Sequence, residues 1–127
     1  MSIVYKNGTP YLEELNLTEL TEKIETPFYI YSQKKIVDRY NLLKNTLNKN
    51  IYFSVKANSN QAILYLLKSL GAGADVVSYE EMVRALKAGI SSSKIIFEGV
   101  GKSTYDIQQA IKYNIKQINA ESIEELK

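Results

Sequence analysis

Apolar residues downstream of position 28 fall into short runs separated by longer amphipathic segments. The runs are rich in β-branched and aromatic side chains and are too short for helices, a pattern typical of strands buried in a parallel sheet. They predict five strands, at residues 28–31, 51–55, 74–77, 94–97 and 116–120.

The segments between these runs predict helices, because their apolar positions recur at spacings of three and four residues. The predicted helices follow Ser32, follow the polar turn 57–60, and cover 80–88 and 104–113, with another beginning at Ser122. Gly71 and Gly89 are placed to end the second and third of them. Ser78 and Glu81 are spaced as a capping box for the third.

The strands and helices alternate at a spacing of about 22 residues, which predicts repeated βα units and a parallel α/β sheet. Equal short units without a long crossover favour a partial TIM-type (β/α) barrel of about five parallel strands over an open doubly wound sheet. A complete eight-stranded barrel takes about 250 residues. We therefore expect these 127 residues to be the amino-terminal part of a longer polypeptide.

The first 25 residues have a different pattern. Residues 3–5 and 11–12 predict two short strands around a turn that ends at Gly8. Thr18 is expected to cap a short helix over 18–24, which ends before Thr26-Pro27. The predicted organisation is a leader, residues 1–25, followed by a barrel segment, residues 26–127.

The composition removes several classes of function. The net charge is +2 and the lysines are scattered, so no nucleic-acid-binding surface is indicated. Cysteine and histidine are absent, which excludes disulfides, thiolate metal sites and imidazole catalysis. No signal pattern and no apolar run near the roughly 18 residues of a membrane span are present, so we expect a cytoplasmic protein without a metal site.

Lys56 is the candidate catalytic residue. It lies where the predicted strand 51–55 ends, and the carboxyl ends of parallel strands are where α/β proteins bind ligands. Among apolar walls its charged form would be disfavoured, which would leave a neutral amine able to attack an aldehyde. The alternative is a solvated loop lysine, which is the commoner situation for lysine.

Asp75 is the second candidate, since it lies within an otherwise apolar predicted strand. An unpaired carboxylate is costly there, so it needs a partner. It either forms a structural salt bridge or helix-end bond, or it lies on the inner face of the barrel near Lys56. Glu98 and Glu121 also follow strands and are interpreted as solvated or helix-start acids.

Two glycine-bearing stretches do not match nucleotide-binding motifs. Residues 71–73 lack the third glycine of a dinucleotide fingerprint and precede a strand, so they are interpreted as a helix end and a tight turn. Residues 99–103 imitate the end of a phosphate-binding loop, but Ile96 occupies the position of its first glycine. The second stretch can still line a site at the barrel mouth.

Five motifs together resemble a known family. They are YFSVKAN (52–58), GAGADVVS (71–78), ALKAG (85–89), GVGK (99–102) and INAES (118–122). In order and spacing they are similar to the amino-terminal barrel segment of the diaminopimelate decarboxylases, which belong to the alanine-racemase-like, fold-type III group of pyridoxal-phosphate enzymes. The resemblance runs from about Thr26 to the last residue, and more weakly into the leader.

The resemblance implies a cofactor and roles for both candidates. Lys56 would form the Schiff base with pyridoxal phosphate, and Asp75 would lie near that lysine and the cofactor. The family removes the carboxylate at the D-configured carbon of meso-2,6-diaminopimelate, a small diamino acid, and yields L-lysine and carbon dioxide. The electron-poor cofactor ring holds the electrons left behind. The parent is expected to be a homodimer, and its leader is expected to pair with a carboxy-terminal β domain.

This chain departs from the family pattern at two positions. Tyr79 stands where glycine is common and Ser54 where alanine is common. The ring-stacking histidine, the glycine-rich phosphate cradle, the glutamate on the ring nitrogen and the partner-subunit residues of the family come later in the chain. We therefore expect the 127 residues alone neither to hold the cofactor well nor to decarboxylate.

Other functions stay open on the sequence alone. Within the same fold they are a decarboxylase of the ornithine, arginine or carboxynorspermidine type, or an amino-acid racemase. Outside it, the chain could be a non-catalytic fragment that binds partner subunits through an exposed sheet edge.

Overall fold

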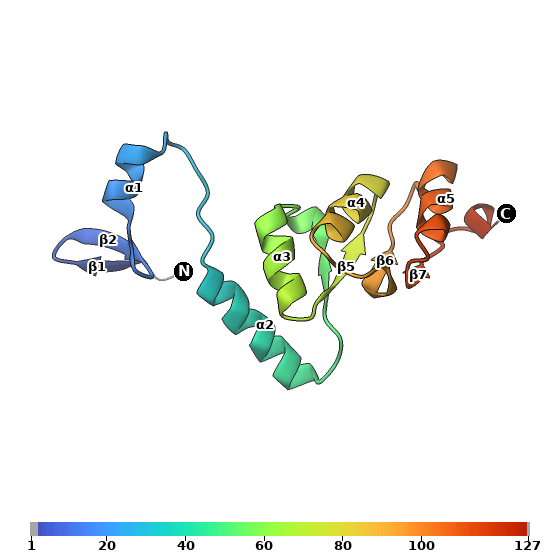
Figure 1. The fold of residues 1–127 in the computed structure, drawn as a ribbon, viewed down its shortest axis with the longest axis horizontal. Coiled ribbons are helices and arrows are strands. Elements are labelled where there is room, and N and C mark those ends of the chain that lie inside the picture. The colour runs from blue at the N-terminus through green and yellow to red at the C-terminus, as the bar shows by residue number, and fades with distance from the viewer. Residues whose placement is uncertain (1–2, 127) are drawn as a thin grey trace. The chain divides into compact units, whose positions relative to one another are not determined.

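The computed structural model describes residues 3–126 (Figure 1). Residues 1, 2 and 127, which the predicted leader and barrel segment include, lie outside the described residues. The elements are β1 Val4–Lys6, β2 Thr9–Leu12, β3 Leu15–Asn16, α1 Leu17–Lys23, α2 Gln33–Leu47, β4 Tyr52–Ser54, η1 Val55–Ala57, α3 Gln61–Ser69, β5 Gly73–Val76, α4 Tyr79–Lys87, η2 Ser92–Lys94, β6 Ile95–Phe97, α5 Thr104–Lys112, β7 Gln117–Ile118 and η3 Glu124–Leu126. They divide into two units, Met1–Ile36 and Val37–Lys127.

The first unit contains an antiparallel sheet of order β1-β2-β3. Its first turn has Asn7 and Gly8 at φ 51° and 81°, as a two-residue hairpin with the right-handed strand twist requires. The predicted cap of α1 was wrong by two residues. Asn16 accepts hydrogen bonds from the N–H groups of Thr18 and Glu19, so Thr18 lies inside the helix.

The predicted strand at residues 28–31 was also wrong, because this segment has no regular secondary structure. Its apolar and aromatic composition favours an extended chain, but a strand also needs a hydrogen-bonded neighbour. The composition of residues 28–31 indicates an extended chain, but it cannot indicate whether a neighbouring strand is present to pair with it.

The second unit is built on a parallel sheet of order β4-β5-β6-β7. The helices α3, α4 and α5 each connect one of these strands to the next along the chain. This confirms the predicted α/β class, the parallel sheet and the βα alternation over residues 51–118. The last predicted helix is different, because the chain beyond Ser122 forms the short 3-10 turn η3.

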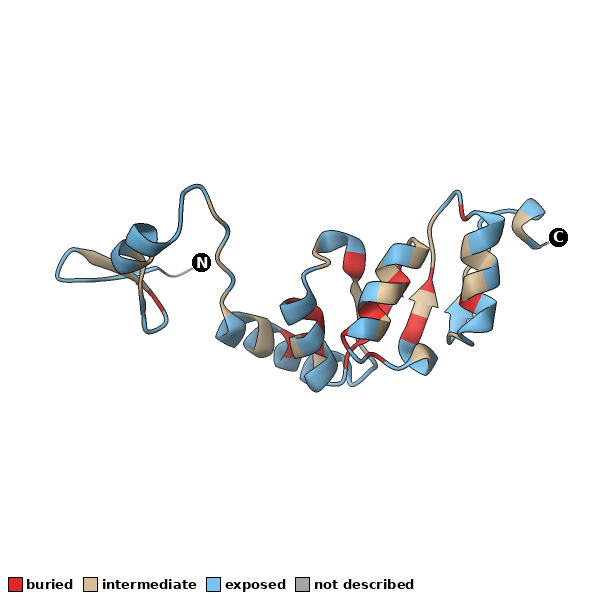
Figure 2. Ribbon diagram, turned by 45° about the horizontal axis from the view of Figure 1, so that its top comes forward, coloured by how far each residue is buried: buried red, intermediate tan, exposed pale blue. Residues whose placement is uncertain are grey.

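The core of the second unit lies between one face of the sheet and its helices. Val55, Ala74, Val76, Ile95 and Phe97 contribute from the strands and η1, and each is fully buried. Their partners come from the facing sides of the helices and the segment after α4, namely Leu64, Met82, Ala85, Ala88, Ile90 and Ala110. Figure 2 shows buried positions, coloured red, on the strands and helices of this unit.

The alternate residues of the strands lie on the other face, which we call the open face. It carries Tyr52, Ser54, Asp75, Ile96 and Gln117, none of which is fully buried. The open face is therefore the one on which side chains can meet a ligand.

The helices from α2 to α5 end in the same way. A residue in the left-handed conformation follows each of them: Asn48, Gly71, Gly89 and Asn114, with φ of 48°, 95°, 85° and 50°. Glycine and asparagine are the residues that tolerate this conformation best, so the two predicted glycine stops are confirmed.

The helix starts are capped by short polar side chains. The hydroxyl of Ser32 accepts from the N–H of Lys35 at 3.0 Å, and Asn60 accepts from Ala62. Ser78 accepts from the N–H of Glu81, as predicted, but the Glu81 carboxylate accepts from Val77 rather than from Ser78. The predicted capping box is thus half formed, and its second bond is shifted by one residue.

Asp106 links the beginnings of α4 and α5. One carboxylate oxygen accepts from the N–H of Tyr79 at 3.0 Å, and the other accepts from the N–H and the hydroxyl of Ser103 at 2.9 and 2.6 Å. The ring of Tyr79 packs edge-to-face on Tyr105, with centroids 5.2 Å apart. Burial opposes ionisation of Asp106, but the bonds from the Ser103 hydroxyl, the Ser103 N–H and the Tyr79 N–H outweigh it and lower the pKa of Asp106.

We expect Asp106→Asn to lower the free energy of unfolding by about 1–2 kcal/mol at pH 7, because an amide cannot accept from all three donors. A lowered folded-state pKa means that the carboxylate stabilises the fold above its unfolded pKa of about 3.9 and stops doing so as pH falls through the folded value. Urea unfolding at pH 7 and pH 3 measures this. The difference in the free energy of unfolding between wild type and Asp106→Asn should be smaller at pH 3 than at pH 7. Glu80→Gln, which replaces an exposed first-turn acid, should change the free energy of unfolding little at either pH. A difference of equal size at both values would contradict the assignment.

Candidate functional site

Lys56 lies in η1, the 3-10 turn that directly follows β4. Val55 anchors the turn in the core, and the N–H of Asn58 closes it on the Val55 carbonyl at 3.0 Å. The side chain of Asn58 then accepts from the N–H of Asn60, the cap of α3. The strand, the turn and the helix start therefore fix the backbone of Lys56 at the carboxyl end of the sheet.

The Lys56 side chain itself is exposed. The expectation that apolar walls surround it is wrong for the described residues, because β4 is an edge strand of the sheet and only β5 lies beside it. Within residues 3–126, neither a hydrogen bond nor an ion pair engages the amine. The amine is thus free to react, although this structure does not enclose it.

Asp75 lies in β5 on the open face, with Ser54 of β4 on one side in the register and Ile96 of β6 on the other. One of its carboxylate oxygens, Oδ1, is buried and has no hydrogen-bond partner in the described structure. The predicted alternative of a structural salt bridge therefore finds no partner there. Its strand contacts η1, so the elements that carry Lys56 and Asp75 are neighbours.

A second buried polar atom without a hydrogen-bond partner is the hydroxyl oxygen of Ser54. In the sequence Ser54 stood out merely as a departure from a common alanine. Its place beside Asp75 depends on the pairing of β4 with β5, which no local pattern reports. The signal in the sequence that could have identified Ser54 as a site residue is a polar residue within a predicted strand, two positions before the candidate lysine.

The stretch after β6 does not offer a free lysine. Lys102 is buried, and its ammonium donates to the Gly99 carbonyl at 2.6 Å and to Glu125 at 3.0 Å. The backbone N–H of Glu121 and then the Lys102 ammonium lower the pKa of Glu125. Lys102 thus ties the loop after β6 to η3, which the sequence did not predict.

The remaining candidates have minor roles. Gly71 ends α3 and Gly73 begins β5, as interpreted from the sequence. Glu98 is half-buried after β6 and Glu121 is exposed after β7. No three acidic residues lie close enough to hold a metal ion in the part of the chain that the structure describes. Helices long and apolar enough to cross a membrane are absent from residues 3–126.

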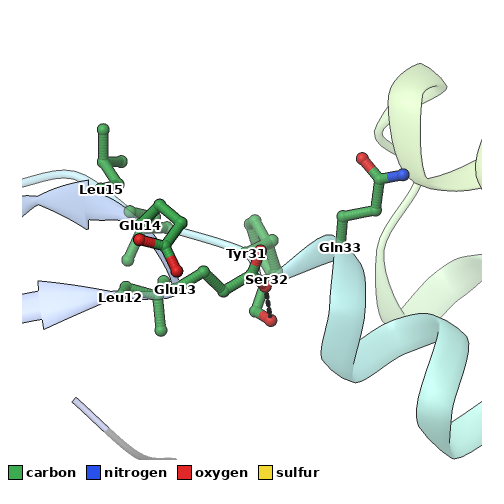
Figure 3. A pocket seen from close by; sticks show the side chains of 8 residues that line it. Leu12, Glu13, Glu14, Leu15, Tyr31, Ser32 and Gln33 are labelled. Carbon is green, nitrogen blue, oxygen red and sulfur yellow. Dashed lines mark hydrogen bonds between the residues drawn. The ribbon is translucent and has the colours of Figure 1, made fainter. Parts of the chain in front are cut away.

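A cavity of about 420 Å³ lies in the first unit (Figure 3). It is lined by residues 12–15 and 30–33, and a hydrogen bond from the Ser32 hydroxyl to Glu13 crosses it. Neither Lys56 nor Asp75 lines it, and its walls carry no free amine. The lining of the cavity therefore includes neither candidate residue.

Comparison with known proteins gives a consistent family. Residues 33–127 match the pyridoxal binding domain of the pyridoxal-dependent decarboxylases. A diaminopimelate decarboxylase of Helicobacter pylori strain J99 is 49% identical over 115 residues, which are 88% of this chain and 28% of that protein.

Two solved structures are similar in fold and sequence. The diaminopimelate decarboxylase of Helicobacter pylori complexed with L-lysine has a TM-score of 0.84 at 46% identity, covering 87% of this chain and 29% of that one. The enzyme of M. jannaschii in complex with L-lysine has a TM-score of 0.92 at 35% identity, covering 95% and 30%. The chain thus spans less than a third of these relatives. Over residues 33–127 it belongs to the family of pyridoxal-dependent decarboxylases.

Proposed function

We propose that the full-length protein uses pyridoxal phosphate to decarboxylate meso-2,6-diaminopimelate to L-lysine and carbon dioxide. The observation that carries the proposal is a free amine, Lys56, at the carboxyl end of a parallel sheet, in a turn that contacts the strand of an unpaired carboxylate. Relatives that are 49% identical and named for this reaction support the choice of substrate.

The residues present fit the cofactor. An aldehyde needs an unengaged amine, and Lys56 has one. A protonated nitrogen near that amine needs an acceptor, and the buried Oδ1 of Asp75 is an acceptor without a donor. Lys56 would hold the cofactor covalently, and Asp75 would orient the proton-bearing nitrogen.

The bound cofactor would supply an electron-poor ring that accepts the electron pair left by departing carbon dioxide. The chain's own residues would do the rest. The Lys56 amine would be released when the substrate amine takes its place, and it could then carry a proton before it binds the cofactor again. In this proposal Asp75 serves only as a hydrogen-bond acceptor, and Lys56 is the group that moves the proton.

We further propose that residues 26–127 are part of a TIM-type barrel in a homodimeric cytoplasmic enzyme, whose leader, residues 1–25, pairs with a later β domain. The parallel order β4-β5-β6-β7 supports the barrel. So does the amine of Lys116, just before β7, which lies 5.9 Å from the ring centroid of Tyr52 in β4. Side chains from both edges of the described sheet thus approach each other near the amino ends of the strands, which is consistent with a curved sheet.

Assay of the protein encoded by the complete reading frame tests the reaction. With pyridoxal phosphate and meso-2,6-diaminopimelate, we expect equal amounts of carbon dioxide and L-lysine, measured by trapped ¹⁴CO₂ and chiral chromatography. L-Ornithine, L-arginine and carboxynorspermidine are the matched alternative substrates, and L-alanine tests for racemisation. Faster turnover of any of these four than of meso-2,6-diaminopimelate would overturn the assignment of substrate.

A further inference from the structure

Ser54 and Asp75 are direct neighbours in the ladder that joins β4 to β5. Paired residues of adjacent parallel strands point to the same face and have Cα atoms about 4.8 Å apart. A serine hydroxyl and an aspartate carboxylate on such a pair can be joined by one hydrogen bond after a change of side-chain rotamer, although the two do not bond in this structure.

Both side chains have a buried oxygen without a hydrogen-bond partner, Oγ of Ser54 and Oδ1 of Asp75. Buried polar atoms are rarely left unpaired, because each one loses its bonds to water. On the other side of Asp75 in the ladder Ile96 is apolar, Gly73 has no side chain, and the Tyr52 hydroxyl belongs to the residue paired with Gly73 rather than with Asp75. Ser54 therefore carries the donor that lies beside Asp75 in the ladder.

We propose that Ser54 is a positioning residue, whose hydroxyl donates to Oδ1 of Asp75 when pyridoxal phosphate is bound. The bond would satisfy both orphaned oxygens and hold the carboxylate in one orientation for the ligand, because a carboxylate oxygen can accept more than one hydrogen bond. An ionised carboxylate can only accept and a hydroxyl can donate, so the direction of the bond is fixed. The inference rests on the proposed function, because the bound state it describes contains the cofactor.

The experiment is a double-mutant cycle on the full-length protein, with Ser54→Ala, Asp75→Asn and the double variant. Pyridoxal phosphate is titrated into each cofactor-free protein, and absorbance of the bound cofactor gives the dissociation constant. We expect Ser54→Ala to weaken binding about tenfold, the effect of losing a hydrogen bond to a charged group. In the Asp75→Asn background the same change should cost less, about twofold, because a neutral amide oxygen accepts a weaker hydrogen bond from Ser54 than a carboxylate does.

Two controls separate positioning from a structural role. Ser54→Thr keeps the hydroxyl and should bind the cofactor within about threefold of wild type. The melting temperature of cofactor-free Ser54→Ala should equal or exceed that of wild type, since the change removes a buried hydroxyl without a partner.

Any of three results would overturn the inference: wild-type affinity in Ser54→Ala, an undiminished loss in the Asp75→Asn background, or a lower melting temperature that accounts for weaker binding. Failure of the proposed function is recognised separately. In that case wild type itself would not bind pyridoxal phosphate through Lys56, whatever residue stands at position 54.

Discussion

Replacing Lys56 by alanine is expected to abolish covalent capture of pyridoxal phosphate and to lower kcat/KM for decarboxylation on the order of a thousandfold or more. The physical reason is that the amine is the group that would bind the aldehyde, and no other lysine shares its turn at the carboxyl end of β4. The measurement is borohydride reduction of the loaded full-length protein, followed by peptide mass spectrometry. Wild type should carry the cofactor mass on the peptide that contains Lys56.

Two further variants separate covalent chemistry from charge. Lys56→Arg keeps the positive charge, but a guanidinium stays protonated and cannot attack an aldehyde, so it should be as inactive as alanine. Lys87→Ala removes an exposed lysine from the last turn of α4 and should leave capture and turnover unchanged. Cofactor mass on a different lysine in wild type, or substantial turnover by Lys56→Arg, would refute the assignment.

Gly73→Ala is expected to destabilise the fold by about 2–3 kcal/mol, the usual cost of forcing an extra methyl into a packed site. A Cβ at this position would lie 2.5 Å from the backbone oxygen of Lys94 and 2.5 Å from Cδ1 of Tyr52. Since Gly73 precedes Asp75 by two residues on the same face, a shift of β5 would also weaken cofactor binding. Urea unfolding of the cofactor-free protein measures the change.

Gly101→Ala is the matched control, because its φ is +75° and a Cβ there meets no atom within 4 Å. It should show only the backbone cost of about 1 kcal/mol. Adding Tyr52→Ala to Gly73→Ala separates the two collisions: stability should recover in part if the ring is the obstacle and stay low if the Lys94 carbonyl is. Stability of Gly73→Ala within about 0.5 kcal/mol of wild type would show that β5 accommodates the methyl.

The sequence was sufficient for the strands β4 to β7 and the helices α3 to α5, because the signals for these elements are local. The short apolar runs and the glycines that end helices lie within a few residues of the elements that they specify. As a result, β5, β6 and the ends of α3 and α4 lie within one or two residues of their predicted positions. The same holds for the position of Lys56, since the end of β4 and the polar turn after it are adjacent in sequence.

Features that depend on partners far along the chain were missed. Residues 28–31 have strand composition without the hydrogen-bonded neighbour that a strand requires. The link from Asp106 to Tyr79 spans 27 residues, and the ion pair of Lys102 with Glu125 spans 23. The environment of Lys56 is the same kind of error, because the apolar walls were inferred from a strand buried within a parallel sheet and the described sheet presents β4 as an edge.

The left-handed residues that end α2, α3, α4 and α5 make each helix–strand unit modular. Each terminator is read locally, from a single glycine or asparagine, and the chain turns toward the next strand within a few residues of it. A change in the length of a helix therefore has to be made at its beginning if the strand that follows is to keep its place, because each added turn lengthens the helix by about 5.4 Å. Length variation among homologous proteins should accumulate in the loops that lead from each strand to the next helix, while the spacing between each terminator and its strand stays constant.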